Sequence, residues 1–188
     1  MNVYDFDNTI YDGESSFDFF LFCMKKNKRF LRVLPLILYK MVKYKMCIIT
    51  IDELIKNAET YAMEFFSTFP ELDGMIKEFW DTRMDRIKPY YKKQQKDDDL
   101  IISASPDFLL GEACRRLGIK NCICTRLDSS TGKVEALCFR SNKVDLFYKE
   151  FPDGVIDNFY TDSRNDKPLI KISNAAYIVK GNKIKKVK

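Results

Sequence analysis

The sequence predicts an α/β fold in which a doubly wound parallel sheet carries a mainly helical insert. A short apolar run near the start, residues 3–6, is typical of a buried first strand. A long helical stretch, residues 15–93, follows it. From residue 100 onward, apolar strands alternate with helices, which is typical of a parallel sheet covered on both faces.

The insert contains three segments with helical start signals or helical spacing. These helices are expected at residues 15–26, 50–66 and 70–87. The first begins with Ser15 or Ser16. The second begins with Thr50 and has Glu53 three residues later, a capping-box pattern. The third places apolar residues three or four positions apart, so the insert should be a helical layer.

A charged segment, residues 92–99, separates the insert from the second half of the chain. Strands are expected there at 100–104, 121–127, 133–139, 155–161, 175–179 and 183–187, and helices at 106–118 and 141–151. Pro106 and Gly118 are helix start and stop signals, and turn residues at 129–132 and 181–182 indicate hairpins. We therefore expect a core of residues 1–13 and 95–188 and a cap of residues 14–94.

The composition is that of a globular protein. The chain has 188 residues, of which 46% are hydrophobic and 14% aromatic, enough for a core with a small insert. Its formal net charge is +5, from 32 basic and 27 acidic residues. Such a mild excess does not by itself indicate nucleic acid, and no nucleic-acid partner is expected.

Cysteine and histidine usage excludes several kinds of catalysis. The chain has no histidine, which removes every Ser–His or Cys–His mechanism. Its six cysteines include no CxxC pair, so a zinc site is not expected. Because no signal peptide precedes the first strand, we expect a cytoplasmic protein with buried, reduced thiols. Acid–base chemistry must then fall to carboxylates, Lys, Tyr or Cys.

Polar side chains capable of phosphate chemistry follow several of the predicted strands. They are Asp5 and Asp7 after the first strand, Ser103 in the second, Lys143 at a helix start, and Asp162 and Asp166 after NFYT. Ligands of parallel sheets bind beyond the carboxyl ends of the strands, so these groups should meet there beneath the cap. Clustered carboxylates favour Mg²⁺, and a hydroxyl and an ammonium beside them suit a phosphate. The pattern indicates phosphoryl transfer to a carboxylate.

In this order, DFDNT, Ser103, Lys143 and DSRND resemble the four motifs of the haloacid dehalogenase (HAD) superfamily of phosphatases. The helical insert is similar to the cap of its phosphoserine-phosphatase-like branch, which includes members that act on lipid phosphates. SASP, GIKNCICTRLD and the TGK hairpin strengthen the match to that branch. The resemblance covers essentially the whole chain and implies a Rossmann-like core and Mg²⁺ as cofactor.

The resemblance assigns roles to the first motif. Asp5 matches the nucleophile and a metal ligand, and Asp7 matches the general acid/base, with its main-chain carbonyl as another metal ligand. Thr9 matches the residue that steadies this loop. Asn8 replaces a small residue often seen there and could crowd the mouth of the site. Glu14 matches an acid that reads the substrate amine; alternatively, it is a solvated acid favourable near a helix start.

The later motifs supply the phosphate site and the remaining metal ligand. By the same resemblance, the hydroxyl of Ser103, the amide of Ala104 and the ammonium of Lys143 bind phosphate. Asp162 matches the metal-binding acid. Asn165 and Asp166 match the outer part of the motif, which positions water, metal or lysine, and Asn165 is a candidate for contacting the phosphate or substrate. Residues 48–82 contain no arginine to hold a substrate carboxylate, which argues against phosphoserine as substrate.

The stretch at residues 28–46 is basic and apolar. Its longest uncharged run is far shorter than the roughly 20 residues that span a bilayer. It is expected either to pack as a cap helix or to lie on an anionic lipid surface. The lysine-rich tail, residues 180–188, is expected to be a solvated edge strand.

Together these observations predict a Mg²⁺-dependent phosphomonoester hydrolase that works through an aspartyl-phosphate. Its substrate should be a small or amphiphilic phosphate monoester, with a lipid phosphate among the candidates. Two alternatives remain: a phosphotransferase, or a catalytically silent module of the same fold that binds a membrane surface or a partner. The sequence does not predict the oligomeric state.

Overall fold

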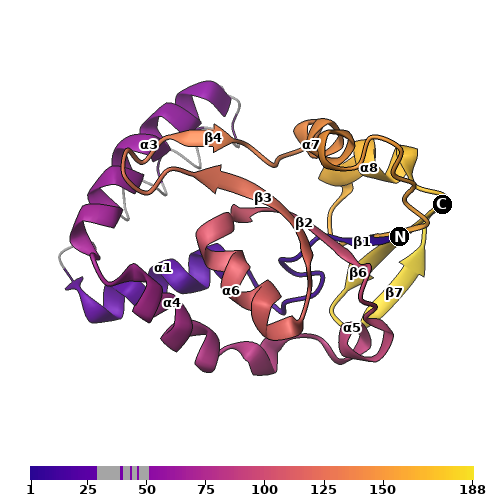
Figure 1. The fold of residues 1–188 in the computed structure, drawn as a ribbon, viewed down its shortest axis with the longest axis horizontal. Coiled ribbons are helices and arrows are strands. Elements are labelled where there is room, and N and C mark those ends of the chain that lie inside the picture. The colour runs from indigo at the N-terminus through magenta and orange to yellow at the C-terminus, as the bar shows by residue number, and fades with distance from the viewer. Residues whose placement is uncertain (29–38, 40–42, 44–45, 47–50) are drawn as a thin grey trace.

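The computed structural model describes residues 1–28, 39, 43, 46 and 51–188. Its centre is a seven-stranded sheet of order β4-β3-β2-β1-β5-β6-β7 (Figure 1). The strands are β1 Asn2–Tyr4, β2 Leu100–Pro106, β3 Asn121–Leu127, β4 Val134–Ala136, β5 Asn158–Thr161, β6 Ala175–Lys180 and β7 Lys183–Lys186. The five inner strands pair in parallel, and the two edge strands are antiparallel to their neighbours. This confirms the predicted α/β fold class.

Helices cover both faces of the sheet and form the insert. The insert contains α1 Ser15–Lys26, α3 Ile51–Thr68, α4 Leu72–Asp81, the short η2 Met84–Arg86 and α5 Pro89–Gln94. The second half contributes α6 Asp107–Leu117, α7 Asn142–Glu150, η3 Arg164–Asp166 and α8 Lys167–Ile172. Helices α1, α3 and α4 lie together at one end of the molecule, and α7 and α8 lie at the other (Figure 1).

Several expected elements are shorter in the structure: β1 ends at Tyr4 rather than at residue 6, and the strand expected at 155–161 begins at Asn158. The helix expected at 70–87 ends at Asp81, where the amides of Thr82 and Arg83 donate to the carbonyls three residues before them. The Thr82 hydroxyl also donates to the Phe79 carbonyl, at 2.9 Å. The strand expected at 133–139 is only Val134–Ala136. The predicted helix start at Thr50 lies outside the described residues.

The thiol prediction is wrong for one cysteine. Cys23, Cys114, Cys124 and Cys138 are buried and free, but Cys122 is exposed. Cys122 lines a surface pocket together with residues of α6 and α7, so neither helix covers it completely. Cys47 lies outside the described residues.

A ladder of tyrosines sets the register of the central strands. Tyr4 pairs with Tyr160, which pairs with Tyr177. The rings of neighbouring tyrosines stack with centroids 4.6 and 4.7 Å apart. Because Asp5 directly follows Tyr4 and Asp162 follows Tyr160 by two residues, this register brings both acids to the same edge of the sheet.

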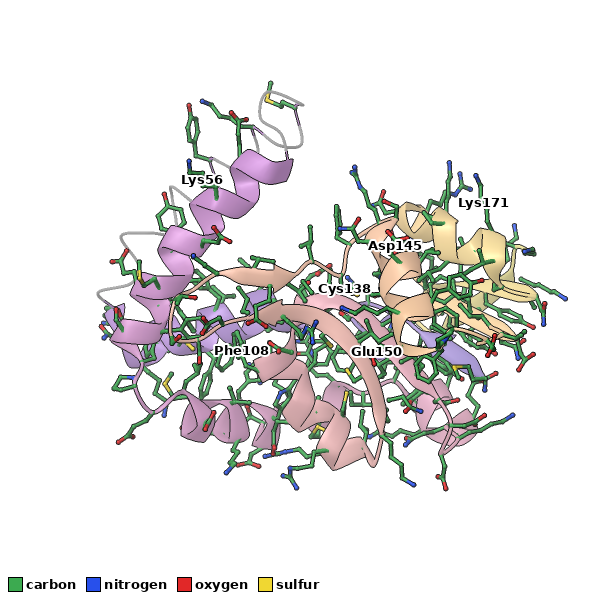
Figure 2. The ribbon with its side chains drawn as sticks, turned by 45° about the horizontal axis from the view of Figure 1, so that its top comes forward. Lys56, Phe108, Cys138, Asp145, Glu150 and Lys171 are labelled. Carbon is green, nitrogen blue, oxygen red and sulfur yellow. The ribbon has the colours of Figure 1, made fainter. Side chains whose placement is uncertain are left out.

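The insert packs closely against the core. Trp80 of α4 is fully buried, and its indole N–H donates to the Leu109 carbonyl of α6 at 2.9 Å. Phe108, labelled in Figure 2, meets the aromatic rings of Phe19 and Phe66 from the insert. Aromatic contacts of this kind bury large apolar areas, so they hold α1, α3 and α4 against α6.

The two chain segments that join insert and core run side by side. Tyr11 and Ile87 form an antiparallel bridge, and the Lys88 amide donates to the Ile10 carbonyl at 2.8 Å. The Arg86 guanidinium bonds to the Asp18 carboxylate and to the Tyr11 hydroxyl. Both crossings between insert and core, near residues 10–12 and 86–88, therefore lie next to the loop that follows β1.

The hairpin between β3 and β4 reaches the insert as well, where it lies beside α3 (Figure 1). The Val134 amide donates to the Glu59 carboxylate at 3.0 Å. Gly132 has a φ of +70°, and a Cβ there would lie 2.7 Å from the Met63 main-chain nitrogen. Glycine is thus needed both for the turn and for the close approach. Within the described residues, no helix is long and apolar enough to cross a membrane.

Candidate active site

Asp5, Lys143 and Asp166 form a buried ion-pair cluster at the carboxyl end of β1. The Asp5 amide donates to the Tyr160 carbonyl at 2.9 Å, which extends the pairing with β5 and fixes the residue at the strand end. Lys143, from the first turn of α7, places its Nζ 3.0 Å from Asp5 and 3.0 Å from Asp166. The Thr161 hydroxyl donates to the other Asp166 oxygen at 2.8 Å. The sequence-predicted Asp5, Lys143 and Asp166 are therefore brought together.

Burial sets the charge balance of this cluster. Burial raises the pKa of Asp5, and the Lys143 ammonium opposes only part of that rise. Burial alone would lower the pKa of Lys143, but the carboxylates of Asp5 and Asp166 more than reverse this, so its pKa is raised. Lys143 thus stays charged, and any further positive charge beside Asp5 would stabilise the ionised form of its carboxyl group.

Asp7 lies between the core and the first helix of the insert. One of its carboxylate oxygens accepts from the Ser105 hydroxyl at 2.5 Å, and the other accepts from the Ser15 main-chain N–H at 2.7 Å. Ser105 also contacts the Ser16 hydroxyl, 2.6 Å away. Burial raises the pKa of Asp7, and the bonds from Ser105 and Ser15 act against this rise. A carboxyl group with a raised pKa and a fixed orientation is suited to donating and accepting protons.

Ser103 lies in β2, beside β1, with almost no exposed surface. Its hydroxyl accepts from the Ser105 amide at 3.2 Å. Ala104, between the two serines, is exposed. The end of β2 thus contacts the loop after β1 through the hydroxyl of Ser105, which bonds to Asp7.

The loop after Asp7 is held from several sides. Asn8 adopts a positive φ of 55°, and its side-chain amide donates to the Glu14 carboxylate at 2.6 Å. Thr9 is fully buried; its carbonyl accepts from the Tyr90 hydroxyl at 2.8 Å, while its own hydroxyl has no partner among the described residues. Burial raises the pKa of Glu14. Asn8 therefore holds the acid that the resemblance assigns to substrate contact.

The polar residues after β5 differ in burial: one reaches the buried cluster, and the others lie closer to the surface. Asp162 is half-buried, and burial raises its pKa while Lys180 opposes the rise. Asp166 points inward to Lys143, as described above. Asn165 is exposed, and its main-chain amide donates to the Ser163 hydroxyl at 3.1 Å. The structure thus brings Asp166 into the buried cluster and leaves Asn165 at the surface.

The donor set at this edge is compatible with a hard divalent cation. Across the described ranges, no group of three or more Asp, Glu or Cys side chains is arranged to hold a metal ion. Two carboxylates, Asp5 and Asp162, and the Asp7 carbonyl could nevertheless serve, because Mg²⁺ commonly keeps several water ligands. Burial disfavours the charged form of both acids, and a cation would stabilise it. The residues present therefore fit Mg²⁺.

Two residues at the site were missed by sequence reasoning. Ser105 has no role in the sequence analysis, yet its hydroxyl bonds to Asp7. Lys88, almost fully buried, donates from its ammonium to the Asn8 carbonyl. The motif SASP contains the serine, and a strand at 100–104 implies that it comes near Asp7. No comparable signal marks Lys88, because it arrives from the second crossing between insert and core.

The fold and this cluster define a class of α/β proteins with an acidic loop after the first strand and a helical insert that follows it. A family model described as haloacid dehalogenase-like hydrolase matches residues 3–171. This match spans most of the chain, so the protein belongs to the haloacid dehalogenase-like hydrolase family. The resemblance seen in the four motifs is thereby confirmed. No curated protein matches the chain.

Solved structures support the same fold. A Bordetella pertussis Tohama I protein described as having unknown function is similar at a TM-score of 0.75 and 18% identity, with 94% of this chain and 87% of that chain covered. A phosphoserine phosphohydrolase-like protein from Francisella tularensis has a TM-score of 0.55 and 17% identity, with 94% of this chain and 86% of that chain covered. A HAD family hydrolase from Salmonella enterica has a TM-score of 0.55 and 14% identity, with 91% of this chain and 59% of that chain covered. At these identities, the likeness concerns the fold.

Proposed function

We propose that the protein is a Mg²⁺-dependent phosphomonoester hydrolase in which Asp5 is the nucleophile. The observation that carries the proposal is the buried Asp5–Lys143–Asp166 cluster at the carboxyl end of the central strand, beside Asp7. Lys143 holds the Asp5 carboxylate at 3.0 Å and supplies positive charge where a phosphate dianion would bind. The family membership and the fold support the same class of reaction.

The reaction follows from the placement of these groups. The phosphate is held by the Ser103 hydroxyl, the Ala104 amide and the Lys143 ammonium. An Asp5 oxygen attacks phosphorus, and the bond to the leaving alkoxide breaks as Asp7 gives that alkoxide its proton. Asp7 then takes a proton from water, which attacks the aspartyl-phosphate and releases phosphate. Bound at Asp5, Asp162 and the Asp7 carbonyl, Mg²⁺ would supply charge neutralisation for the phosphate.

The insert, residues 14–94, is proposed to act as the cap over this site, with residues 1–13 and 95–188 as the catalytic core. Asp7 accepts from the first amide of α1, so the cap and the proton-transfer group are directly connected. Glu14 lies beside Asn8 at the mouth and is the proposed substrate contact. A small or amphiphilic phosphate monoester, including a lipid phosphate, is the proposed substrate.

Phosphate release from 4-nitrophenyl phosphate and from alkyl phosphates tests the proposal. Asp5→Asn should abolish turnover with Mg²⁺ present, and EDTA should abolish turnover of the wild type. Asp12→Asn is the matched control, because Asp12 is an exposed acid in the same loop whose amide bonds to the Arg86 carbonyl. Equal turnover by Asp5→Asn and the wild type would contradict the proposal, provided that thermal unfolding shows both to be folded.

A further inference from the structure

A second basic site lies next to the proposed catalytic centre. A pocket of about 350 Å³ is lined by Asp162 together with Arg164, Lys180 and Lys185, and by the apolar side chains of Ile178 and Val187. Asp162 is shared between this pocket and the site described above. A ligand in the pocket would therefore lie at the same edge of the sheet as a substrate phosphate bound near Asp5.

The sheet topology explains why these cations gather at this edge. Lys180 is the last residue of β6, which runs parallel to β5, so it lies at the same edge as Asp162. Lys185 pairs with Ile178, and paired residues of neighbouring strands point to the same face. Lys186 pairs with Tyr177 and so points to the opposite face. The hairpin thus adds basic side chains to one side of the proposed active site.

The pocket has a net positive charge available for a ligand. Three cations line it against one carboxylate, and none of the three forms an ion pair with a residue in the described part of the chain. Lys180 and Lys185 come from the hairpin of β6 and β7, and Arg164 comes from η3, so the three cations reach the pocket from separate parts of the chain. Unpaired cations crowded in this way favour a bound anion.

We propose that the pocket formed by Arg164, Lys180 and Lys185 binds a second phosphate group of the substrate. This inference rests on the proposed phosphatase function and narrows its substrate class to phosphomonoesters that carry another phosphate. A phosphate dianion matches three cations better than a carboxylate does, and the Arg164 guanidinium can bind two of its oxygens at once. Ile178 and Val187 offer apolar surface to the carbon chain between the two phosphates.

A series of alkane-α,ω-diol bisphosphates with increasing spacer length tests this, with alkyl monophosphates of equal length as the reference. The wild type should show a KM for one spacer length that is about tenfold or more below that of the matched monophosphate, since a single charge-assisted contact has that effect. This advantage should shrink as salt is added. Equal KM values across the whole series would overturn the proposal.

Variants assign the effect to the pocket. Lys180→Gln combined with Lys185→Gln should raise KM for the best bisphosphate about tenfold or more, with kcat and the kinetics of the monophosphate within about twofold of the wild type. The control variant Lys186→Gln/Lys171→Gln removes the same charge from positions outside the pocket lining, one on the opposite face of the hairpin and one on α8. If the control variant raises KM for the bisphosphate as much as the pocket variant does, the effect comes from the overall positive charge of the protein, and the proposal is overturned.

Direct binding separates this inference from the proposed function. Calorimetry with a non-hydrolysable alkane bisphosphonate reports the pocket even if no phosphate is released. Binding that is lost in Lys180→Gln/Lys185→Gln supports the pocket whether or not Asp5 is a nucleophile, and absent or unchanged binding overturns it. If the second phosphate belongs to a lipid, phosphatidylcholine vesicles containing phosphatidylinositol phosphate should sediment the wild type but not the double variant. If the wild type stays in the supernatant, the second phosphate belongs to a soluble substrate.

Discussion

Removal of the Ser105 hydroxyl tests whether Asp7 is the proton donor. Ser105 is almost fully buried, and its hydroxyl donates to an Asp7 oxygen at 2.5 Å. In Ser105→Ala, Asp7 keeps the bond from the Ser15 amide at 2.7 Å. A hydrogen bond to a charged group contributes roughly 1.5–3 kcal/mol, which corresponds to about a 10- to 100-fold effect on a step that depends on it.

The leaving group decides where this effect should appear. An alkoxide needs the Asp7 proton as it departs, whereas 4-nitrophenolate is stable without one. We therefore expect kcat/KM for an alkyl phosphate to fall by about 10- to 100-fold and that for 4-nitrophenyl phosphate by less than about threefold. The assay is steady-state phosphate release with both substrates under the same conditions.

Ser16→Ala is the matched control for this experiment. The Ser16 hydroxyl contacts Ser105 at 2.6 Å and comes from the same helix end as Ser15. We expect both substrates to change by less than about threefold, since the bond between Ser105 and Asp7 remains. Equal losses for both substrates in Ser105→Ala, or no loss for either, would refute the reasoning.

Three further perturbations test the packing and charge of the fold. Lys143→Met leaves two buried carboxylates facing each other and should cost roughly 3–5 kcal/mol in urea unfolding, with turnover lost; unchanged stability would contradict the buried cluster. Arg115 and Arg116 lower the pKa of Glu112 from 4.5 to about 2. The ionised Glu112 therefore stabilises the fold fully above pH 4.5, and this stabilisation is lost as the pH falls toward about 2. Glu112→Gln should therefore lower the melting temperature at neutral pH but not near pH 2, and a difference that persists in acid would contradict this. Gly132→Ala should destabilise by about 1–3 kcal/mol, because its Cβ would lie 2.7 Å from the Met63 nitrogen at a positive φ; a neutral change would mean that the hairpin does not need this contact.

Much of the site could be predicted because strand ends are easy to recognise. Asp5 follows an apolar run, Asp162 follows NFYT, and parallel pairing brings the carboxyl ends together. Lys143 was assigned only with the help of the family resemblance, since nothing local distinguishes it from other lysines. The structure then places it within 3.0 Å of Asp5 and Asp166.

Other features depend on tertiary contacts that leave no local pattern. Lys88 reaches the Asn8 carbonyl only because the two crossings between insert and core run side by side. At the end of α4, the amides of Thr82 and Arg83 donate to the third preceding carbonyl, while the apolar spacing continues as far as Met84. The exposure of Cys122 depends on how α6 and α7 pack over β3, which no local pattern indicates.

The central claim is that Asp5 carries the phosphoryl group during turnover. Asp7→Asn should slow the release of that group, because no base remains to activate water, while 4-nitrophenyl phosphate still permits the first transfer. The decisive measurement is mass spectrometry of peptides from this variant, quenched in acid during turnover with Mg²⁺. The account predicts one phosphoryl group on the peptide that contains Asp5, and none in Asp5→Asn/Asp7→Asn. A wild-type enzyme that turns over while the Asp7→Asn peptide stays unmodified, or a phosphoryl group on another residue, would contradict it.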